Sequence, residues 1–262
     1  MHAATRIASR QHPVVRRCRV LATKPDAGEV LLDGERLVTE ALTAGVPVTA
    51  LLTDGRHSAL ASRAAGAGAT LYEAPDSIIA AASPVRTSSG VVAVARWQPV
   101  PVEAVLTPTP ALVVGLIDVQ DPGNVGSVIR SADALGATGV VAVGATADPG
   151  AWKTLRGSMG SAFRLPVARS DFASLATGGR KKGCRLVATA AHQGLPPDAV
   201  DWTSPVLLLV GREGTGLPQE ALAEADDQVS IPMQAGVDSL NVAVATALLL
   251  HDAHRCRAAA RS

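Results

Sequence analysis

Two polar residues stand at the start of an apolar C-terminal helix, and they are the first candidates for chemistry. Residues 231–257 begin with a flexible loop around Gly236 and then take on a helical spacing of apolar residues. Ser239 is the expected N-cap of this helix, and Asn241 falls in its first turn. The backbone N–H groups of a first helical turn are free to bind a ligand. We therefore predict a binding site at this end of the helix.

The rest of this helix offers little polar surface. Leu240, Val244 and Leu248 share one side, while Leu249 and Leu250 lie elsewhere on the helix. A helix that is apolar nearly all round must be covered on most of its sides. We expect its own domain to cover one part and another chain to cover another.

A glycine-rich loop follows the most apolar predicted strand, residues 206–210. The loop has the sequence GREGTG and contains Gly211 and Glu213. Its spacing fits neither the dinucleotide-binding pattern nor the nucleoside-triphosphate loop with its Lys-Ser/Thr ending. In the usual Rossmann order such a loop also comes first, whereas here it comes late. Taken alone, the loop is compatible with a tight turn as well as with a ligand site.

A predicted β-α-β unit places further polar groups at the end of a strand. Residues 111–117 form an apolar run typical of a buried parallel strand, and a turn at residues 121–123 leads into a helix that starts near Asn124. Arg130 lies off the apolar stripe of this helix. Open α/β sheets bind ligands at the carboxyl ends of their strands. Asn124 and Arg130 are therefore candidate site residues.

A metal site is a competing interpretation of the histidines. His251 and His254 are three residues apart on the final helix, and Cys256 is close to them. Because no acidic or cysteine partner follows at a spacing typical of a metal site, cations at a polar helix end are the favoured explanation. His192 follows a predicted strand and has no partner nearby in the sequence. We expect no bound metal.

The composition is that of a globular protein. The chain has 262 residues, of which 47% are hydrophobic and 18% charged, and this length is sufficient for two domains. A net charge of +1 neither requires nor excludes nucleic acid. Its three cysteines are widely spaced and form no redox motif, and no apolar run reaches membrane length. We expect a cytoplasmic protein that does not bind a membrane.

Prolines divide the chain into two predicted domains. Residues 99–110 contain prolines at positions 99, 101, 108 and 110 and should form a stiff, extended connector. Before them, residues 30–96 alternate between short strands and helices, as is typical of a small α/β/α domain. With the basic segment 1–24, they form the first predicted domain, residues 1–98. This first domain shows no catalytic pair of side chains, so its expected role is binding or scaffolding. Residues 111–262 form the second predicted domain.

Two stretches of the chain are rich in basic residues, and the first of them has two possible interpretations. Residues 1–24 contain six arginine or lysine residues and no acidic residue. They are either a solvated or frayed terminus or a contact to nucleic-acid phosphates. The stretch WKTLRGSMGSAFRLPV is interpreted as a basic loop carrying Lys153, Arg156 and Arg164.

Three segments of the second domain, taken together, resemble a known family. DVQDPGNVGSVIRSADALG, LLLVGREGTGLP and VSIPMQAGVDSLNVAVATALLLHDAHR resemble, in order and spacing, the signature motifs of the SpoU (TrmH-like) RNA ribose methyltransferases of the SPOUT superfamily. LRGSMGSAFRLPV is similar to the linking segment of that family. The resemblance covers residues 111–256. LLDGERLVTEALTAGV and SSGVVAVARW more loosely resemble the ribosomal-protein-like RNA-binding domain that often precedes it.

The resemblance implies a fold that periodicity alone would not propose. The catalytic domain of the family is an α/β fold with a deep trefoil knot, and knots are rare in proteins. The methyl donor S-adenosylmethionine binds in the knotted loops, largely through backbone groups, and the final helix lies in a dimer interface. By motif position, the cofactor-binding residues are Thr189, Leu209, Gly211, Ile231, Met233 and Leu240.

The implied reaction is methyl transfer to a ribose 2′-hydroxyl of RNA. The enzyme must align the hydroxyl with the methyl group and remove its proton, and no metal is required. Arg130 is the activating residue proposed for the family. A guanidinium normally stays protonated, so Arg130 is either that base or a clamp for a phosphate and the developing alkoxide. The implied catalytic residues are Asn124, Arg130, Glu213, Ser239 and Asn241.

The leading hypothesis is an S-adenosylmethionine-dependent RNA 2′-O-methyltransferase, with ribosomal RNA favoured over transfer RNA. A non-catalytic RNA-binding or assembly protein on the same fold is a second hypothesis, and the intact polar set argues against it. A Rossmann-type methyltransferase is a third, and the late glycine-rich loop contradicts it.

Overall fold

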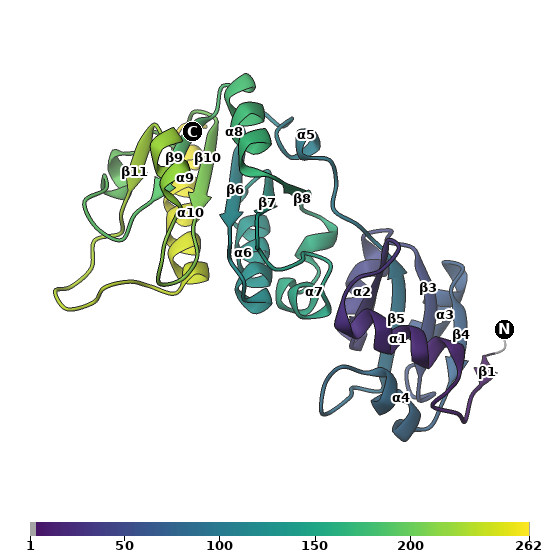
Figure 1. The fold of residues 1–262 in the computed structure, drawn as a ribbon. Coiled ribbons are helices and arrows are strands. Elements are labelled where there is room, and N and C mark those ends of the chain that lie inside the picture. The colour runs from purple at the N-terminus through teal and green to yellow at the C-terminus, as the bar shows by residue number, and fades with distance from the viewer. Residues whose placement is uncertain (1–3, 262) are drawn as a thin grey trace. The chain divides into compact units, whose positions relative to one another are not determined.

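The computed structural model describes residues 4–261, and the chain divides into two compact units. Unit 1 contains the chain up to Gln98 together with Gly150–Phe163. Unit 2 contains Pro99–Pro149 and the chain from Arg164 onward. The chain leaves unit 1 at the start of the Pro-rich stretch, which can be followed in Figure 1 by its colour. Residues 150–163 belong to unit 1 again.

Unit 1 is built on a five-stranded mixed sheet with the order β1-β4-β3-β5-β2. The strands β1, β4 and β3 are parallel to one another, and β5 is antiparallel to both β3 and β2. Most of the side chains in β2, β3 and β5 are buried because helices cover both faces. The strands are Thr5–Arg6 (β1), Glu29–Asp33 (β2), Val48–Thr53 (β3), Thr70–Glu73 (β4) and Val91–Arg96 (β5).

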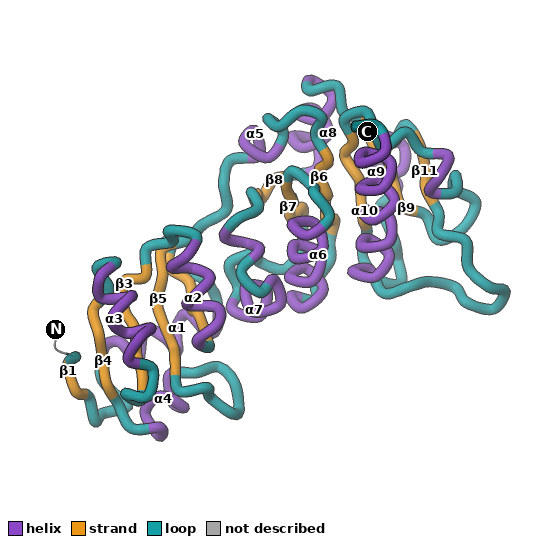
Figure 2. Tube along the Cα trace, turned by 180° about the vertical axis from the view of Figure 1, so that it is seen from behind, coloured by secondary structure: helices purple, strands orange, loops and turns teal. Residues whose placement is uncertain are grey.

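Four helices form the outer layers of unit 1, so that the strands lie between helices in Figure 2. The first and fourth helices pack together on one face, and the second and third pack on the other. Asp33, the last residue of β2, does not cap the second helix. Gly34 is the N-cap, because its φ of 102° turns the chain sharply from strand to helix. The helices are Pro13–Thr23 (α1), Glu35–Thr43 (α2), Ser58–Gly66 (α3) and Asp76–Ala82 (α4).

The basic N-terminal segment contains a packed helix. In α1, Val14, Val15, Cys18 and Leu21 are buried against the sheet. Their spacing places them on one helical face, which leaves the arginines on the outside. The interpretation of this part of the chain as a frayed terminus is therefore wrong, whereas a contact to phosphates stays open.

We expect Cys18 to resist thiol reagents in the native protein. Burial raises the pKa of the Cys18 thiol to about 12, so the reactive thiolate is scarce at neutral pH. Labelling with iodoacetamide at pH 8, followed by peptide mass mapping, should find Cys18 unmodified in native protein and modified after unfolding in guanidinium. The half-exposed Cys256 serves as the accessible reference thiol. Rapid native labelling of Cys18 would show that α1 is not docked.

The segment Gly150–Phe163 packs against the edge strand β2 of unit 1 instead of forming a basic loop. Trp152 packs against the core beneath α1. The ring of Phe163 meets that of Trp97 edge to face, with centroids 6.4 Å apart. These aromatic contacts explain why the segment packs on unit 1. Its basic residues, taken alone, predicted a loop. Its elements are the helix Trp152–Ser158 (α7) and the 3-10 turn Ser161–Phe163 (η1).

Unit 2 contains a six-stranded, fully parallel sheet with the order β11-β9-β10-β6-β7-β8. The chain builds outward from β6 to β8, crosses back, and adds β9, β10 and β11 on the other side. The boundary between β6 and β10 is therefore the point at which the strand order reverses. The strands are Leu112–Ile117 (β6), Gly139–Val143 (β7), Val167–Ser170 (β8), Arg185–Thr189 (β9), Val206–Val210 (β10) and Asp227–Val229 (β11).

Helices cover both faces of this sheet as well. The helices α6 and α10 pack side by side on one face (Figure 2). The other face is covered by α5, α8 and α9, which share one hydrophobic core. The trefoil knot implied by the family resemblance stays a prediction. The helices are Val102–Val105 (α5), Pro122–Ala134 (α6), Phe172–Lys181 (α8), Gln219–Glu224 (α9) and Val242–Ala259 (α10), with a 3-10 turn at Pro197–Ala199 (η2).

The predicted connector is not fully extended. The one-turn helix α5 lies within it, and Val105 and Leu106 join the core of unit 2. The prolines suggest a stiff rod, but burying two branched aliphatic side chains stabilises a packed turn by about 3 kcal/mol or more. Across residues 4–261, no helix is long and apolar enough to cross a membrane.

Arg257 fixes the C-terminal end of α10. Its buried guanidinium donates hydrogen bonds to the backbone carbonyl oxygens of Trp202, Pro110, Ala111 and Ser204, at 2.7 to 2.9 Å. These oxygens lie just before β10 and β6. Arg257 therefore ties the helix to the two strands that carry the candidate site at their opposite ends.

Candidate active site

The loops that follow β6 and β10 meet at the reversal point of the unit 2 sheet. The two strands pair in parallel, with Leu116 opposite Val210, so their carboxyl ends lie together. Asp121 caps α6 after the first strand, accepting a hydrogen bond from the Asn124 backbone N–H at 2.8 Å. The loop after β10 starts with Gly211. Ligands bind at this position in open parallel sheets.

A chain of hydrogen bonds joins three predicted catalytic residues. The side-chain amide of Asn124 donates to Glu213 Oε1. Asn241 Nδ2 in turn donates to Asn124 Oδ1 at 3.1 Å. The Oδ1 atom of Asn241 accepts the backbone N–H groups of Ala243 and Val244, at 2.9 and 3.3 Å. Each amide therefore uses both its donor and its acceptor, which fixes its orientation and leaves the second oxygen of Glu213 available.

The predicted N-cap is wrong by two positions. Asn241, rather than Ser239, caps α10, and Ser239 lies exposed in the preceding loop. Both residue types are good caps, so composition cannot choose between them. The contact with Asn124, which is distant in sequence, favours Asn241.

A cavity of about 500 Å³ opens beside this chain of hydrogen bonds. Glu213, Ser239 and Asn241 stand on its wall, and its interior is mainly apolar. Its size lies within the usual range of roughly 300–1,000 Å³ for a small-molecule site. Five of the six residues predicted to bind a cofactor line it: Thr189, Gly211, Ile231, Met233 and Leu240.

Three predicted site residues do not line the cavity. Asn124 lies outside the lining and contacts it through Glu213 and Asn241. Leu209 is fully buried in the core shared with α8 and α9, because alternate residues of a strand face opposite sides of the sheet. Its neighbour Val210 lines the cavity instead. Arg130 is exposed on α6, six residues after Asn124, and forms no hydrogen bond or ion pair within residues 4–261.

Gly211 stands where the chain passes very close to itself. A Cβ atom added here would collide with the backbone of Gly216 and Leu217. The loop is closed by a hydrogen bond from the Gly216 N–H to the Arg212 carbonyl oxygen at 2.9 Å. The glycine is thus required by the close packing of this loop, which forms part of the cavity wall.

Sequence reasoning missed several residues that line the cavity. Leu249 and Ala245 come from the buried side of α10, and Arg212 and Asp238 come from the flanking loops. The sequence shows that Leu249 is an apolar residue of the helix, but it does not show that its side chain faces the cavity. Arg212 follows Gly211 directly, and this position beside a predicted cofactor-binding residue is the one sequence feature that could have indicated it. Within residues 4–261, no three His, Cys, Asp or Glu side chains gather as a metal site requires.

The sequence model of the SpoU rRNA Methylase family matches residues 111–251, the region that holds every residue of this site. The chain belongs to the SpoU rRNA methylase family. This confirms the family that the three motifs indicate, and the glycine-rich loop is a part of the family pattern rather than an isolated turn.

Named relatives agree with this assignment. The 23S rRNA (guanosine(2553)-2'-O)-methyltransferase RlmP of Bacillus subtilis is 33% identical over 252 residues, covering 94% of this chain and 97% of the relative. A protein of Mycobacterium tuberculosis named as an uncharacterized tRNA/rRNA methyltransferase is also 33% identical, covering 94% of this chain and 81% of the relative.

Solved structures are similar over nearly the whole length. The AdoMet-bound rRNA methyltransferase from Sinorhizobium meliloti has a TM-score of 0.88 and 31% identity, covering 96% of this chain and 98% of that one. The SpoU methyltransferase AviRb from Streptomyces viridochromogenes, in complex with the cofactor AdoMet, has a TM-score of 0.84 and 32% identity, covering 95% and 99%. The α/β fold predicted for the SpoU family is confirmed.

Proposed function

We propose that this protein transfers a methyl group from S-adenosylmethionine to a ribose 2′-hydroxyl of ribosomal RNA. One observation carries the proposal: in a SpoU family chain, a ligand-sized cavity opens beside a carboxylate that Asn124 and Asn241 hold in place. Ribosomal RNA is favoured because the family, the Bacillus subtilis relative and the Sinorhizobium meliloti structure are named for it. Acting on RNA, the protein works in the cytoplasm.

The cavity suits S-adenosylmethionine. Ile231, Leu240 and Met233 offer apolar contacts for an adenine ring, and the backbone around Gly211 offers polar groups to its edge. When bound, S-adenosylmethionine supplies a methyl group on a positively charged sulfur. Arg212, Glu213 and Asp238 provide side-chain charges on the same wall, so the polar parts of the ligand need not be buried without partners.

Glu213 is the residue best placed to receive the proton of the ribose hydroxyl. Asn124 holds one carboxylate oxygen, and the other is free to accept a hydrogen bond from the 2′-hydroxyl. As the hydroxyl oxygen is methylated, its proton passes to this oxygen of Glu213 and from there to solvent. Ser239, exposed on the same wall, can donate a hydrogen bond that holds the ribose.

Arg130 acts outside the cavity in this proposal. Its exposed guanidinium is free to clamp an RNA phosphate next to the target ribose. We expect Arg130→Ala to lower methyl transfer roughly a hundredfold, while stability stays within about 0.5 kcal/mol and S-adenosylmethionine affinity is unchanged. Arg130→Lys should recover activity only if a point charge suffices. Single-turnover rates and isothermal titration measure these effects, and wild-type turnover by Arg130→Ala would remove Arg130 from the site.

The protein acts as a homodimer through α10 in this proposal. One side of the helix is buried within its own unit, but Val244 and Leu248 are 49% and 44% exposed, one turn apart on the outer side. An apolar stripe at this spacing is typical of a helix that packs against another chain. The second copy is the occupant we propose, because the same helix carries Asn241 at its start and so links assembly to the site.

We expect Leu248→Asp to produce a folded monomer. Burying an unpaired charge in the interface costs several kcal/mol, whereas the same change on an exposed surface costs about 0.5 kcal/mol or less. Sedimentation velocity at micromolar concentration should show half the wild-type mass. The matched control is Val20→Asp on α1, which is 45% exposed and should leave the mass unchanged. A wild-type protein that sediments as a monomer contradicts the dimer.

Transfer RNA is the alternative substrate, since the mycobacterial relative is named for both RNA classes. The two can be separated by incubating purified protein with labelled S-adenosylmethionine and either ribosomal RNA or transfer RNA from a strain that lacks this gene. Mapping of 2′-O-methyl sites then locates the modified nucleotide. If neither RNA gains a methyl group, the protein is a non-catalytic RNA-binding member of the family.

A further inference from the structure

Unit 2 contains a second cavity, of about 320 Å³, which shares the glycine-rich loop with the proposed cofactor cavity. It is built at the carboxyl ends of three strands: Asp118 follows β6, Ala145 follows β7, and the glycine-rich loop follows β10. Arg212 and Gly216 line both cavities. Because Arg212 directly precedes Glu213, the proposed proton acceptor, an occupant of the second cavity stands next to the reacting ribose.

The carboxylate of Asp118 is held in place by the turn that follows β7. Its Oδ1 atom accepts a hydrogen bond from the Ala145 backbone N–H at 2.7 Å. A Cβ atom added at Gly144 would collide with the same oxygen, so the carboxylate rests directly on that turn. Its Oδ2 atom has no partner within residues 4–261, although the residue is half-buried. Asp118 therefore brings a positioned acceptor that the fold itself does not use.

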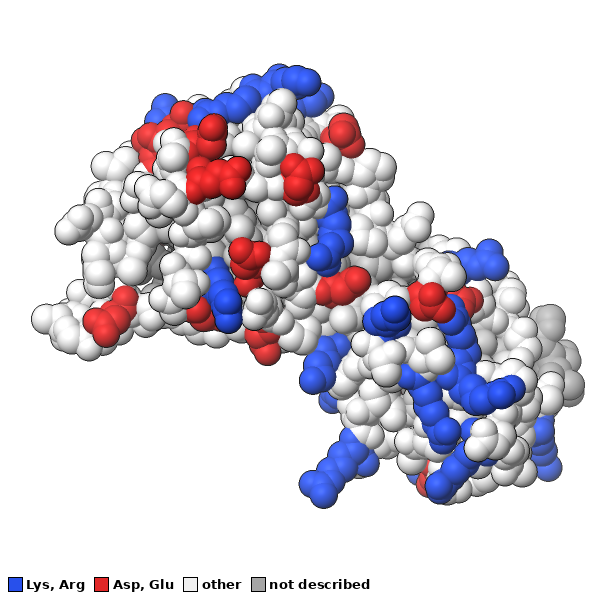
Figure 3. All heavy atoms as spheres, in the orientation of Figure 1, with Lys and Arg blue, Asp and Glu red and all other residues white. Residues whose placement is uncertain are grey.

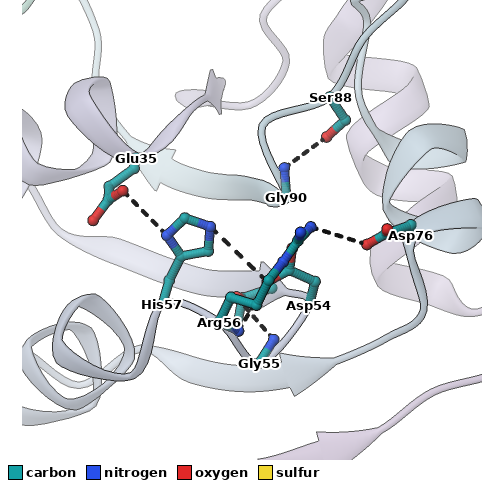
Figure 4. Close-up of polar contacts among 9 residues, drawn as sticks. Glu35, Asp54, Gly55, Arg56, His57, Asp76, Ser88 and Gly90 are labelled. Carbon is teal, nitrogen blue, oxygen red and sulfur yellow. Dashed lines mark hydrogen bonds and ion pairs between the residues drawn. The ribbon is translucent and has the colours of Figure 1, made fainter.

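An aspartate at the equivalent place in unit 1 has partners for both of its oxygens. Asp54 follows β3 directly, as Asp118 follows β6. Its Oδ1 atom accepts the Arg56 backbone N–H at 2.9 Å, and its Oδ2 atom accepts the Arg56 Nε–H at 2.6 Å. His57 Nε2 lies 3.9 Å from Oδ1 (Figure 4). Asp54 is thus satisfied within its own unit, whereas half of the Asp118 carboxylate is left for a ligand.

Donor groups line the second cavity as well. Gln120 and Arg212 are exposed, and neither side chain forms a hydrogen bond or ion pair within residues 4–261. Leu217 and Pro218 add apolar surface. Acidic and basic side chains are interspersed on the face of unit 2 drawn in Figure 3. Recognition in this unit therefore depends on placed hydrogen bonds, which carry specificity, rather than on a field of one sign.

We propose that the second cavity binds the base of the methylated nucleotide and that this base is guanine. The inference rests on the proposed function and adds the nucleotide that the enzyme selects. A base taken out of its stack is read by hydrogen bonds to its pairing edge and by contact with its faces. Leu217 and Pro218 supply that contact in the second cavity.

The pairing edge of guanine matches the groups on the wall. Guanine alone among the four RNA bases presents two adjacent donors, N1–H and N2–H, beside an acceptor, O6. The two donors suit the two oxygens of the Asp118 carboxylate, each of which accepts more than one hydrogen bond. The side-chain amide of Gln120 donates to O6. Arg212 borders the cofactor cavity too, so Gln120 is the donor that we assign to the base.

A titration with free nucleotides tests the base without requiring methyl transfer. Full-length protein is first saturated with S-adenosylhomocysteine, which fills the cofactor cavity and carries no methyl group to donate. It is then titrated with GMP, IMP and AMP and followed by NMR. We expect GMP to bind at least about tenfold more tightly than AMP, because a bidentate contact discriminates between bases to this extent. IMP, which lacks the N2 amino group, should lie between them. Equal binding of GMP and AMP would overturn the inference.

Asp118→Asn assigns the preference to the second cavity. Asparagine keeps an oxygen for the Ala145 N–H but places an amide donor against the donors of guanine. The affinity for GMP should therefore fall to that of AMP. The matched control is Asp198→Asn, an exposed aspartate of η2 outside both cavities, which should keep the preference. S-adenosylhomocysteine affinity and thermal unfolding show whether each variant is folded. A folded Asp118→Asn protein that still prefers GMP contradicts the assignment.

Gln120→Ala changes an exposed side chain and provides a test that does not disturb the turn after β7. It should weaken the binding of GMP and IMP alike, because both carry O6, and leave the binding of AMP unchanged. Equal weakening of all three nucleotides, or of none, would remove Gln120 from the base contact.

Methyl transfer connects the cavity to the reaction. With ribosomal RNA from a strain that lacks the gene, the mapped 2′-O-methyl site should be a guanosine. In a synthetic RNA of the mapped sequence, inosine at that position should lower kcat/KM at least about tenfold in the wild type. The same change should matter less than about twofold in Asp118→Asn, which has already lost the partner of the N2 amino group.

The outcomes separate this inference from the proposed function. A methylated adenosine, cytidine or uridine would overturn the inference and leave the proposed function standing. If wild-type protein methylates no RNA, the proposed function fails, and the nucleotide titration still decides whether the second cavity selects guanine.

Discussion

Replacing Glu213 with glutamine is expected to lower the rate of methyl transfer at least about a hundredfold. Removing a general base typically costs 10²- to 10⁴-fold in rate. Glutamine keeps an oxygen that can accept the hydrogen bond of Asn124, so the chain from Asn241 to the loop survives. It cannot take up a proton from the ribose hydroxyl. The rate under single-turnover conditions with saturating S-adenosylmethionine measures this effect directly.

The matched control is Glu220→Gln, an exposed glutamate in the first turn of α9, outside the cavity. It removes the same charge from the same unit and should leave the rate unchanged. Affinities for S-adenosylmethionine and for RNA should change less than threefold in Glu213→Gln, because the lost function is proton transfer. An unchanged rate in that variant would assign the proton to another acceptor.

Gly211→Ala is expected to lower the affinity for S-adenosylmethionine by at least tenfold. The new Cβ atom would collide with backbone atoms of Gly216 and Leu217, which cannot rotate away as a side chain could. Overpacking of this kind typically costs about 1–3 kcal/mol, and 1.4 kcal/mol corresponds to a tenfold change in affinity. Because the displaced loop forms the cavity wall and carries Glu213, turnover should fall together with binding.

Isothermal titration calorimetry tests this change, with thermal unfolding as the measure of the fold. Gly66→Ala is the control, since a Cβ atom there meets nothing within 4 Å and the residue is helical. It should bind S-adenosylmethionine like the wild type and be slightly more stable. Normal S-adenosylmethionine binding by Gly211→Ala would show that the loop does not form the binding wall.

The sequence by itself determined the strands of the parallel sheet and the family. The apolar runs of β6, β7 and β10 are long and uninterrupted, and each of them lies in the parallel sheet where such runs are required. The three motifs identify the family because their order and spacing can be recognised along the chain without knowledge of the fold. Five of the six predicted cofactor-binding residues line one cavity for the same reason.

Only the tertiary structure decided which polar groups meet. Asn124 bonds to Glu213, 89 positions away, and to Asn241, 117 positions away, and no periodicity along the chain encodes such pairs. The N-cap of α10 is Asn241 and not the expected Ser239, and Asn241 is the residue that also contacts Asn124. Leu248 and Leu249 are both apolar, but their surroundings in the fold differ. Leu249 lines the cavity, whereas Leu248 is exposed.

The same holds for the segment around α7, whose basic residues predict a loop but which packs on unit 1 through Trp152 and Phe163. A local pattern reports the face that a residue occupies on its own helix or strand. It does not report the partner of that face, because the partner is set by side chains that approach from distant parts of the chain. For this reason the sequence could not show that Arg130, six residues after Asn124, is absent from the lining of the cavity.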